Sequence, residues 1–71
     1  MKRFGEKLRV LRKRQGLTLR HLGDMLDVDY GYIGRMERGE KIPNVAMLLK
    51  IADAFSADIN QLLRDELELE D

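Results

Sequence analysis

The 71-residue sequence contains no cysteine and no tryptophan, only one proline, and few aromatic residues, which make up 6% of the chain. Without cysteine the chain can form neither a disulfide nor a cysteine-based zinc site. No apolar run approaches the roughly 20 residues of a membrane span, and no signal-peptide segment is visible. We therefore expect a cytoplasmic protein with no membrane association, whose stability comes from helix packing, with or without a partner subunit.

The sequence also has few residues suited to catalysis or metal binding. His21 is the single histidine, and no cysteine or second histidine accompanies it. No glycine-rich phosphate loop is present, and the carboxylates cluster mainly near the C-terminus, where a mobile chain end cannot hold two groups at a fixed separation. We therefore expect no enzyme, no cofactor and no metal site, and we interpret His21 as an ordinary surface side chain.

The net charge is zero, but the charges are unevenly distributed. Residues 1–41 hold eleven Lys/Arg and six Asp/Glu, a local charge of +5, whereas residues 42–71 hold two and seven, a local charge of −5. A local basic face is what phosphate contacts need, whatever the total charge. The alternative is that the basic half is merely a charged helix and the acidic half a solvated tail.

The segment from Thr18 to Gly39 predicts two short helices joined by a tight turn. Gly23 is a small residue at which a second helix can approach closely, Asp27 falls at the turn, and Asp29 is a plausible N-cap. The apolar residues at helical spacing are Leu22, Leu26 and Val28 in the first half, and Ile33 and Met36 in the second. This pattern is typical of a helix-turn-helix, whose second helix can enter a DNA major groove.

The same reasoning places helices along the rest of the chain. A first helix over 3–15 has one apolar face, ends at Gly16 and carries basic residues on its other faces. Helices over 19–26, 30–38, 45–55 and 59–65 follow, with Thr18, Asp29, Asn44 and Asp58 as N-caps. The apolar face of the first helix is Phe4, Leu8 and Leu11, and its basic residues are Lys2, Arg3, Lys7, Arg9, Lys13 and Arg14. The 45–55 helix has a wide apolar stripe: Met47, Leu48, Leu49, Ile51, Ala52 and Phe55.

The last six residues alternate acid and leucine, as ELELED. Alternation can indicate an edge strand, but like charges at a chain end favour a frayed tail. We therefore predict one DNA-binding domain over 1–65 and an acidic tail over 66–71.

The 30–38 helix leaves a set of residues facing outward that suit DNA recognition. Arginine can donate two hydrogen bonds to guanine, and tyrosine can contact phosphate or a thymine methyl group. Two glycines in one helix cost stability, which close approach of the backbone to DNA would explain. The outward residues are Tyr30, Gly31, Gly34, Arg35 and Arg38, with Leu19 exposed nearby and Tyr32 on the flank. The alternative is that the two tyrosines pack on neighbouring helices.

Three stretches carry a resemblance to a known family: LRVLRKRQGLT, YIGRMERGEKIPN, and LLKIADAF followed by INQLL. Together they resemble the Xre-type helix-turn-helix family, which includes the lambdoid phage repressors, over about residues 3–64. The resemblance implies an all-α fold of five helices, with the helix-turn-helix formed by the second and third.

The resemblance also implies roles for individual residues. It implies base contacts from Tyr30, Gly31 and Arg35, and an internal ion pair between Arg12 and Glu37. We expect contacts to the DNA backbone from Thr18, Leu19, Arg20, Tyr32, Arg38, Lys41 and Asn44. Four residues depart from the family pattern, namely Leu19, Asp27, Asp29 and Gly31, and they leave Arg35 and Tyr30 as the main base readers, with DNA shape supplying further selectivity.

These observations favour a transcriptional regulator, most simply a repressor, that binds double-stranded DNA as a homodimer through the 45–55 and 59–65 helices. The alternative is a protein-interaction or antitoxin-like module whose DNA binding needs a partner. Leu19 and the acidic tail favour that alternative.

Overall fold

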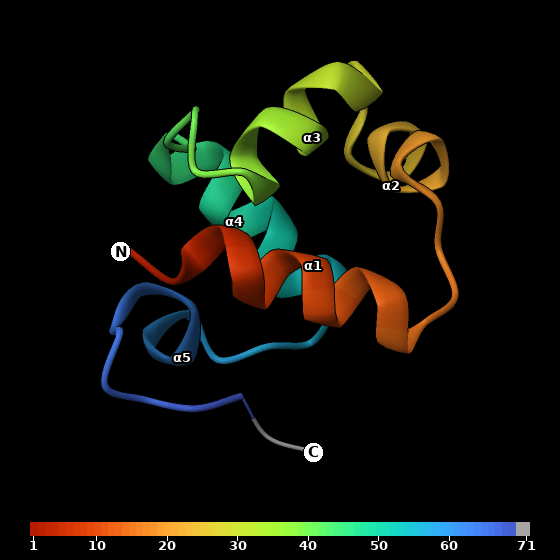
Figure 1. The fold of residues 1–71 in the computed structure, drawn as a ribbon. Helices are drawn as coiled ribbons and strands as arrows, with labels where there is room; N and C mark the ends of the chain where they lie inside the picture. The colour runs from red at the N-terminus through yellow and green to blue at the C-terminus, as the bar shows by residue number, and fades with distance from the viewer. Residues whose placement is uncertain (70–71) are drawn as a thin grey trace.

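Five α-helices make up the fold in the computed structural model, which describes residues 1–69 (Figure 1). They are α1 (Phe4–Arg14), α2 (Leu19–Leu26), α3 (Tyr30–Glu37), α4 (Val45–Ala54) and α5 (Ile59–Leu63). No strand occurs in the described residues, and no helix among them is long and apolar enough to cross a membrane. The predicted five-helix all-α architecture is confirmed, with helix ends within two residues of the predicted ones.

Helix α1 crosses the middle of the molecule and separates two sides of it. In Figure 1, α3 lies on one side of α1, whereas α5 and the C-terminal segment lie on the other. Helix α1 packs against both α3 and α5, and α2 packs against α3 and α4. The helix-turn-helix formed by α2 and α3 therefore occupies one side of the fold.

The hydrophobic core draws on every helix. Each fully buried aliphatic side chain contributes about 1.5–3 kcal/mol relative to its exposed state. The six that are almost completely inaccessible are Leu8, Leu22, Ile33, Met36, Ile51 and Leu62. The predicted apolar stripe of α4 is buried only in part, because Leu49 is 57% exposed.

The helix ends follow the predicted capping chemistry. The Thr18 hydroxyl accepts from the backbone N–H of His21 at 3.0 Å, and the Asn44 side chain accepts from the N–H of Met47 at 2.8 Å. Asp29 and Asp58 cap α3 and α5 in the same way. Gly16 and Gly39 follow α1 and α3 in the left-handed region, with φ of +67° and +78°, which glycine adopts without steric cost.

Helix α1 approaches the end of α3 closely at Gly5. A Cβ atom at this position would lie 2.5 Å from the backbone oxygens of both Met36 and Glu37. Neither oxygen can move without shifting α3, so the absence of a side chain at Gly5 sets the distance between the two helices.

The prediction that Lys7 lies on an exposed basic face of α1 is wrong. Its side chain is buried, and its ammonium donates to the backbone oxygens of Gln61, of Arg64 at 2.9 Å and of Leu67 at 2.7 Å. These oxygens surround the end of α5, where backbone carbonyls have no partner within the helix. Lys7 is therefore an internal C-terminal cap of α5 and is unavailable to DNA.

The chain after α5 is also packed against α1, so the predicted frayed tail is wrong for residues 66–69. Asp65 accepts hydrogen bonds from the backbone N–H groups of Lys2 at 3.0 Å and Arg3 at 2.9 Å. The Arg3 guanidinium donates to both oxygens of Glu68 at 2.8 and 2.9 Å, and Leu69 packs on the core. A packed leucine and a paired arginine outweigh the repulsion between neighbouring acids. The predicted tail residues Glu70 and Asp71 lie outside the described residues.

These contacts shift the ionisation of the two acidic groups. The backbone hydrogen bond from Arg3 is the main cause that lowers the pKa of Asp65, and the side-chain hydrogen bond from Arg3 lowers the pKa of Glu68. Both groups are stabilised as carboxylates in the folded chain.

Candidate nucleic-acid interface

The turn between α2 and α3 is built on a left-handed residue and a glycine. Asp27 ends α2 with φ 58° and ψ 46°, a conformation that aspartate tolerates better than most residues. A Cβ on Gly23 would lie 2.8 Å from the Val28 oxygen and 3.1 Å from the Tyr30 nitrogen. The absence of that carbon lets the turn and the start of α3 pack closely against α2, as the sequence predicted.

An ion pair holds the other end of α3. Arg12 donates from Nε and Nη2 to the two oxygens of Glu37 at 2.7 and 3.0 Å, and from Nη1 to the Leu17 oxygen at 2.9 Å. The two charged side chains are only 11% and 7% exposed. The hydrogen bond to Glu37 is the main cause that raises the pKa of Arg12. The ion pair implied by the resemblance is thus present, and it joins α1, the segment before α2, and α3.

The outer face of α3 presents Tyr30 and Arg35. Tyr30 is 48% exposed, and the Arg35 side chain is exposed about 1.4 helical turns further along. Gly31 lies between them, where a Cβ would be 3.3 Å from Asp29 Oδ2 and 3.8 Å from Arg35 Nη1. The glycine therefore leaves space at the surface for the side chains of Asp29 and Arg35.

Gly34 does not face outward as predicted. It is buried, and a Cβ there would lie 3.8 Å from Leu19 Cδ1 and 3.1 Å from the Arg38 guanidinium. Leu19 is itself half-buried rather than exposed and packs on the core. Leu19 at the start of α2 and the Arg38 side chain therefore cover this part of α3, so Gly34 does not present the backbone to DNA.

Tyr30 carries a contact that connects the two helices. The Arg20 guanidinium carbon of α2 lies 5.3 Å from the centre of the Tyr30 ring. This is within the range of a cation–π interaction, worth about 0.5–1 kcal/mol at an exposed site. One face of the ring is thereby covered, and a cation from α2 is placed beside the first residue of α3.

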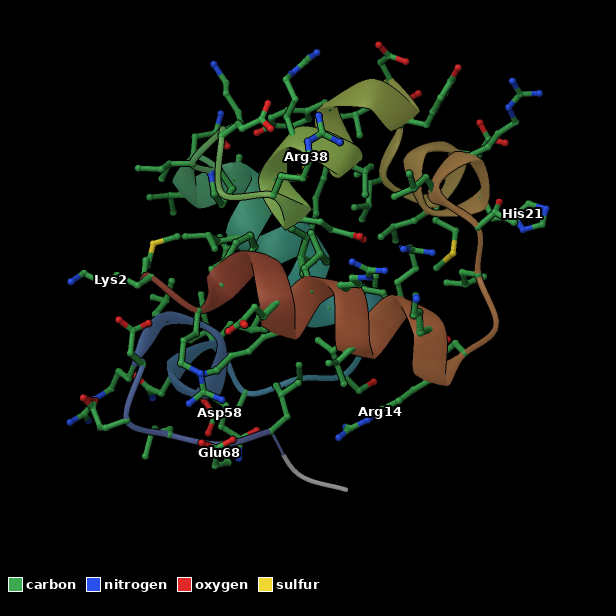
Figure 2. The ribbon with its side chains drawn as sticks, viewed as in Figure 1. Lys2, Arg14, His21, Arg38, Asp58 and Glu68 are labelled. Carbon is green, nitrogen blue, oxygen red and sulfur yellow. The ribbon has the colours of Figure 1, made fainter. Side chains whose placement is uncertain are left out.

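The remaining residues predicted to contact DNA differ in whether their side chains already have a hydrogen-bond partner within the protein. Arg38 follows α3 on its outer surface (Figure 2) and donates to Glu40 at 2.7 Å, which lowers the pKa of Glu40. Lys41 is exposed in the loop after α3. Thr18 and Asn44 are exposed, but each uses an oxygen as a helix cap, so only their donor groups remain for phosphate.

Two residues predicted to contact the DNA backbone, Leu19 and Tyr32, have fewer groups available for such a contact. Leu19 offers only its backbone N–H, which lies in the first turn of α2 and has no partner within the helix. Tyr32 is half-buried and packs against the core, as the alternative interpretation of the tyrosines proposed. His21 is exposed at the α2 end of the molecule (Figure 2), and Glu68 lies on the side of α1 away from α3.

Three features escaped the sequence reasoning: the buried Lys7, the Arg20–Tyr30 contact and the Arg38–Glu40 pair. A signal for Lys7 was available, because its position between Phe4, Leu8 and Leu11 completes the i, i+3, i+4, i+7 pattern of a buried helix face. The Arg20–Tyr30 contact depends on the angle between two helices, which spacing alone does not give.

The geometry defines a small helix-turn-helix domain, and comparisons with known proteins agree. The helix-turn-helix family model HTH_3 matches residues 8–62. The transcriptional regulator ClgR of Mycobacterium tuberculosis is 38% identical over 61 residues, which are 86% of this chain and 54% of ClgR. The chain therefore spans about half the length of that relative. An uncharacterized HTH-type transcriptional regulator of Bacillus subtilis, YazB, is 27% identical over 89% of this chain and 91% of its own.

Solved structures give the same result. The P22 c2 repressor, crystallised in complex with a synthetic operator, superposes with a TM-score of 0.83 at 32% sequence identity, covering 89% of this chain and 96% of that one. The restriction-modification controller protein C.AhdI of Aeromonas hydrophila gives a TM-score of 0.78, also at 32% identity, covering 87% and 94%. The chain belongs to the HTH_3 helix-turn-helix family of DNA-binding transcriptional regulators, which are not enzymes.

Proposed function

We propose that this protein is a transcriptional repressor that binds a pseudo-palindromic operator as a homodimer. Each protomer places α3 in the major groove, and the two grooves are successive, roughly 34 Å apart. Occupancy of the operator, without any chemical step, then regulates transcription. The observation that carries the proposal is the outer surface of α3, where Tyr30 and Arg35 are exposed on a helix fixed at both ends.

In this proposal the residues divide into base readers and backbone contacts. Arg35 reads guanine through its two-pronged guanidinium, and Tyr30 contacts a neighbouring base or its methyl group. Arg20, Arg38 and Lys41 surround them with positive charge, which suits phosphate oxygens on both sides of a groove. Arg38 exchanges its Glu40 partner for a phosphate, because a strong acceptor on the DNA replaces an exposed carboxylate.

Two observations from the comparisons support the proposal. The P22 c2 repressor, a structure of the same fold, is bound to an operator. RghR of Bacillus subtilis, 34% identical over 89% of this chain, is an HTH-type transcriptional repressor.

Selection of bound duplexes from a random DNA pool, at near-physiological salt, tests the proposal. We expect enrichment of an inverted repeat whose half-sites are about one helical turn apart. An Arg35→Ala variant run in parallel should lose preference at one base of each half-site while the rest of the motif remains. An unenriched pool with the unmodified protein would contradict sequence-specific binding and favour the partner-dependent, antitoxin-like alternative.

A further inference from the structure

An apolar hollow lies between the start of α1 and the loop that joins α3 to α4. Its volume is about 440 Å³, within the range of small-molecule pockets in proteins. Figure 1 shows the N-terminal segment and this loop at the same end of the molecule. The apolar residues that line the hollow are Met1, Phe4, Met36, Ile42 and Pro43. We call this feature the α1 hollow.

The α1 hollow has a buried floor and exposed apolar walls. Phe4 and Met36 are 3% and 1% exposed, so the floor belongs to the hydrophobic core and is fixed in place. Ile42 is 74% exposed, the largest value among the exposed large hydrophobic residues of the described chain, and Met1 is 43% exposed. A ligand with an apolar chain would remove the surface of these two walls from water, which favours binding.

The backbone on both sides of the hollow is held by the fold. On one side, Asp65 accepts a hydrogen bond from the backbone N–H of Lys2 at 3.0 Å. On the other, Gly39 turns the chain out of α3 with φ +78°, and the ring of Pro43 restricts the backbone just before α4. The two walls are therefore positioned before any ligand arrives, which lowers the entropic cost of binding.

Two lysines give the rim of the hollow a positive charge. Lys2 and Lys41 both line it and are exposed, and Figure 2 shows Lys2 at this end of the molecule. Within the part of the chain that the structure describes, neither ammonium has a carboxylate partner, because Glu40 pairs with Arg38 and Asp65 accepts from backbone N–H groups. The floor thus suits an apolar group and the rim suits an anion.

We propose that the α1 hollow binds a small molecule with an unbranched alkyl chain that ends in a carboxylate, and that this ligand weakens DNA binding. The alkyl chain covers Phe4 and Ile42, and the carboxylate pairs with Lys2 and Lys41. Lys41 is also a proposed phosphate contact, so the ligand and DNA compete for its charge. The effect on DNA rests on the proposed function. Because the two binding events are linked, DNA must lower the affinity for the ligand by the same factor.

Titration of the DNA-free protein with octanoate, followed by NMR of the backbone amides, tests the site itself. We expect shifts confined to the lining residues, among them Phe4, Met36 and Ile42. Ile42→Asp should weaken octanoate binding about tenfold or more, because it removes an apolar wall and adds a repelling charge. Val45→Asp is the matched control, since Val45 is 69% exposed but does not line the hollow, and it should bind octanoate unchanged. Shifts spread over all exposed apolar residues, or equal weakening in the two variants, would overturn the proposal.

Octanol, which has the same chain without the charge, tests the role of the lysines. We expect it to bind about threefold to tenfold more weakly than octanoate, and the double variant Lys2→Gln/Lys41→Gln should abolish this difference. Equal binding of octanol and octanoate to the unmodified protein would show that the rim does not select a carboxylate.

Fluorescence anisotropy with the selected operator tests the effect on DNA. Saturating octanoate should weaken binding about threefold or more and reduce its salt dependence, whereas Lys41→Ala should be much less sensitive to octanoate. Octanoate that binds the protein but leaves operator affinity unchanged would overturn the regulatory part of the inference. Failure of the protein to bind any operator without octanoate would contradict the proposed function, while the titration of the DNA-free protein would still decide whether the site exists.

Discussion

Arg12 and Glu37 form a two-point ion pair, with N–O distances of 2.7 and 3.0 Å, between α1 and the last turn of α3. We expect Arg12→Met to lower the free energy of unfolding by about 3–5 kcal/mol, because it leaves the carboxylate of Glu37 unpaired and almost inaccessible. Urea denaturation measures the change. Arg9→Met, at an exposed position of the same helix, is the control and should change stability by less than about 0.5 kcal/mol.

The double variant Arg12→Met/Glu37→Leu shows whether the single variant loses stability because a charge is left unpaired or because packing contacts are lost. Replacing both charges by apolar groups of similar volume should recover much of the lost stability. If the single variants unfolded at the same urea concentration as the unmodified protein and bound DNA equally well, the pair would have no role in holding α3.

Lys7 should be among the most sensitive positions in the chain. Lys7→Met keeps the aliphatic stem but removes the ammonium donor from the carbonyl oxygens of Gln61, Arg64 and Leu67, of which the Arg64 oxygen keeps only the Leu67 N–H. We expect a loss of about 2–3 kcal/mol in the free energy of unfolding. Hydrogen exchange should show the largest loss of protection in α5. Lys13→Met, at an exposed position of α1, should have little effect, and equal effects of the two variants would contradict the internal role of Lys7.

Gly5 and Gly31 are predicted to respond oppositely to the same substitution. Gly5→Ala introduces a carbon 2.5 Å from two backbone oxygens of α3, so we expect a loss of about 1–3 kcal/mol in the free energy of unfolding. Gly31→Ala meets only the movable side chains of Asp29 and Arg35 and improves helix propensity, so stability should be unchanged or rise by up to about 1 kcal/mol. Thermal unfolding compares the two, and a stable Gly5→Ala variant would contradict the close packing of α1 and α3.

The lowered pKa of Asp65 predicts acid sensitivity. Because the folded pKa lies below the unfolded value of about 3.9, the stabilisation is fully present above about pH 5. It is lost as pH falls through the folded pKa, when the carboxyl group becomes protonated. Asp65→Asn should lower the free energy of unfolding at pH 7 and flatten its dependence on pH between about 5 and 3. Asp24→Asn, on the exposed surface of α2, is the control and should keep the original slope.

Arg35 and Lys41 should affect DNA binding in different ways. If Arg35 reads guanine, Arg35→Ala costs about 1–3 kcal/mol on the selected operator and little on duplexes changed at that base. If Lys41 contacts phosphate, Lys41→Ala weakens binding to all duplexes alike and reduces the salt dependence by about one unit. Fluorescence anisotropy at several salt concentrations measures both. An equal loss on every duplex would reassign Arg35 to the backbone, and an unchanged salt slope would exclude Lys41.

Local signals predicted the fold well, because the end of a helix and the residue that caps it lie within a few positions of each other in the sequence. Thr18, Asp27, Asp29 and Asn44 all adopt the roles that their chemistry indicated. Lys7 did not, because its acceptors lie 54 to 60 residues away and a lysine is normally exposed. The acidic end was misjudged for the same reason, since its partner Arg3 is at the opposite end of the chain.

The surface of α3 was predicted in part. Tyr30 and Arg35 are exposed as expected, whereas Gly34 is covered by Leu19. Helical spacing shows which residues share a face of one helix, but it does not show where a neighbouring helix crosses that face. The contact of Arg20 with the Tyr30 ring and the partial burial of Tyr32 depend on such crossings.

The connection between Lys7 and the end of α5 also constrains the order in which the chain can fold. Lys7 is synthesised early, yet the last of its carbonyl acceptors belongs to Leu67. While the chain emerges from the ribosome, N-terminus first, this ammonium must stay hydrated, and the part of α1 around it cannot complete its burial. Final closure of the domain therefore waits until the chain through Leu67 has been synthesised, and until then the α1 surface that α5 later covers stays exposed.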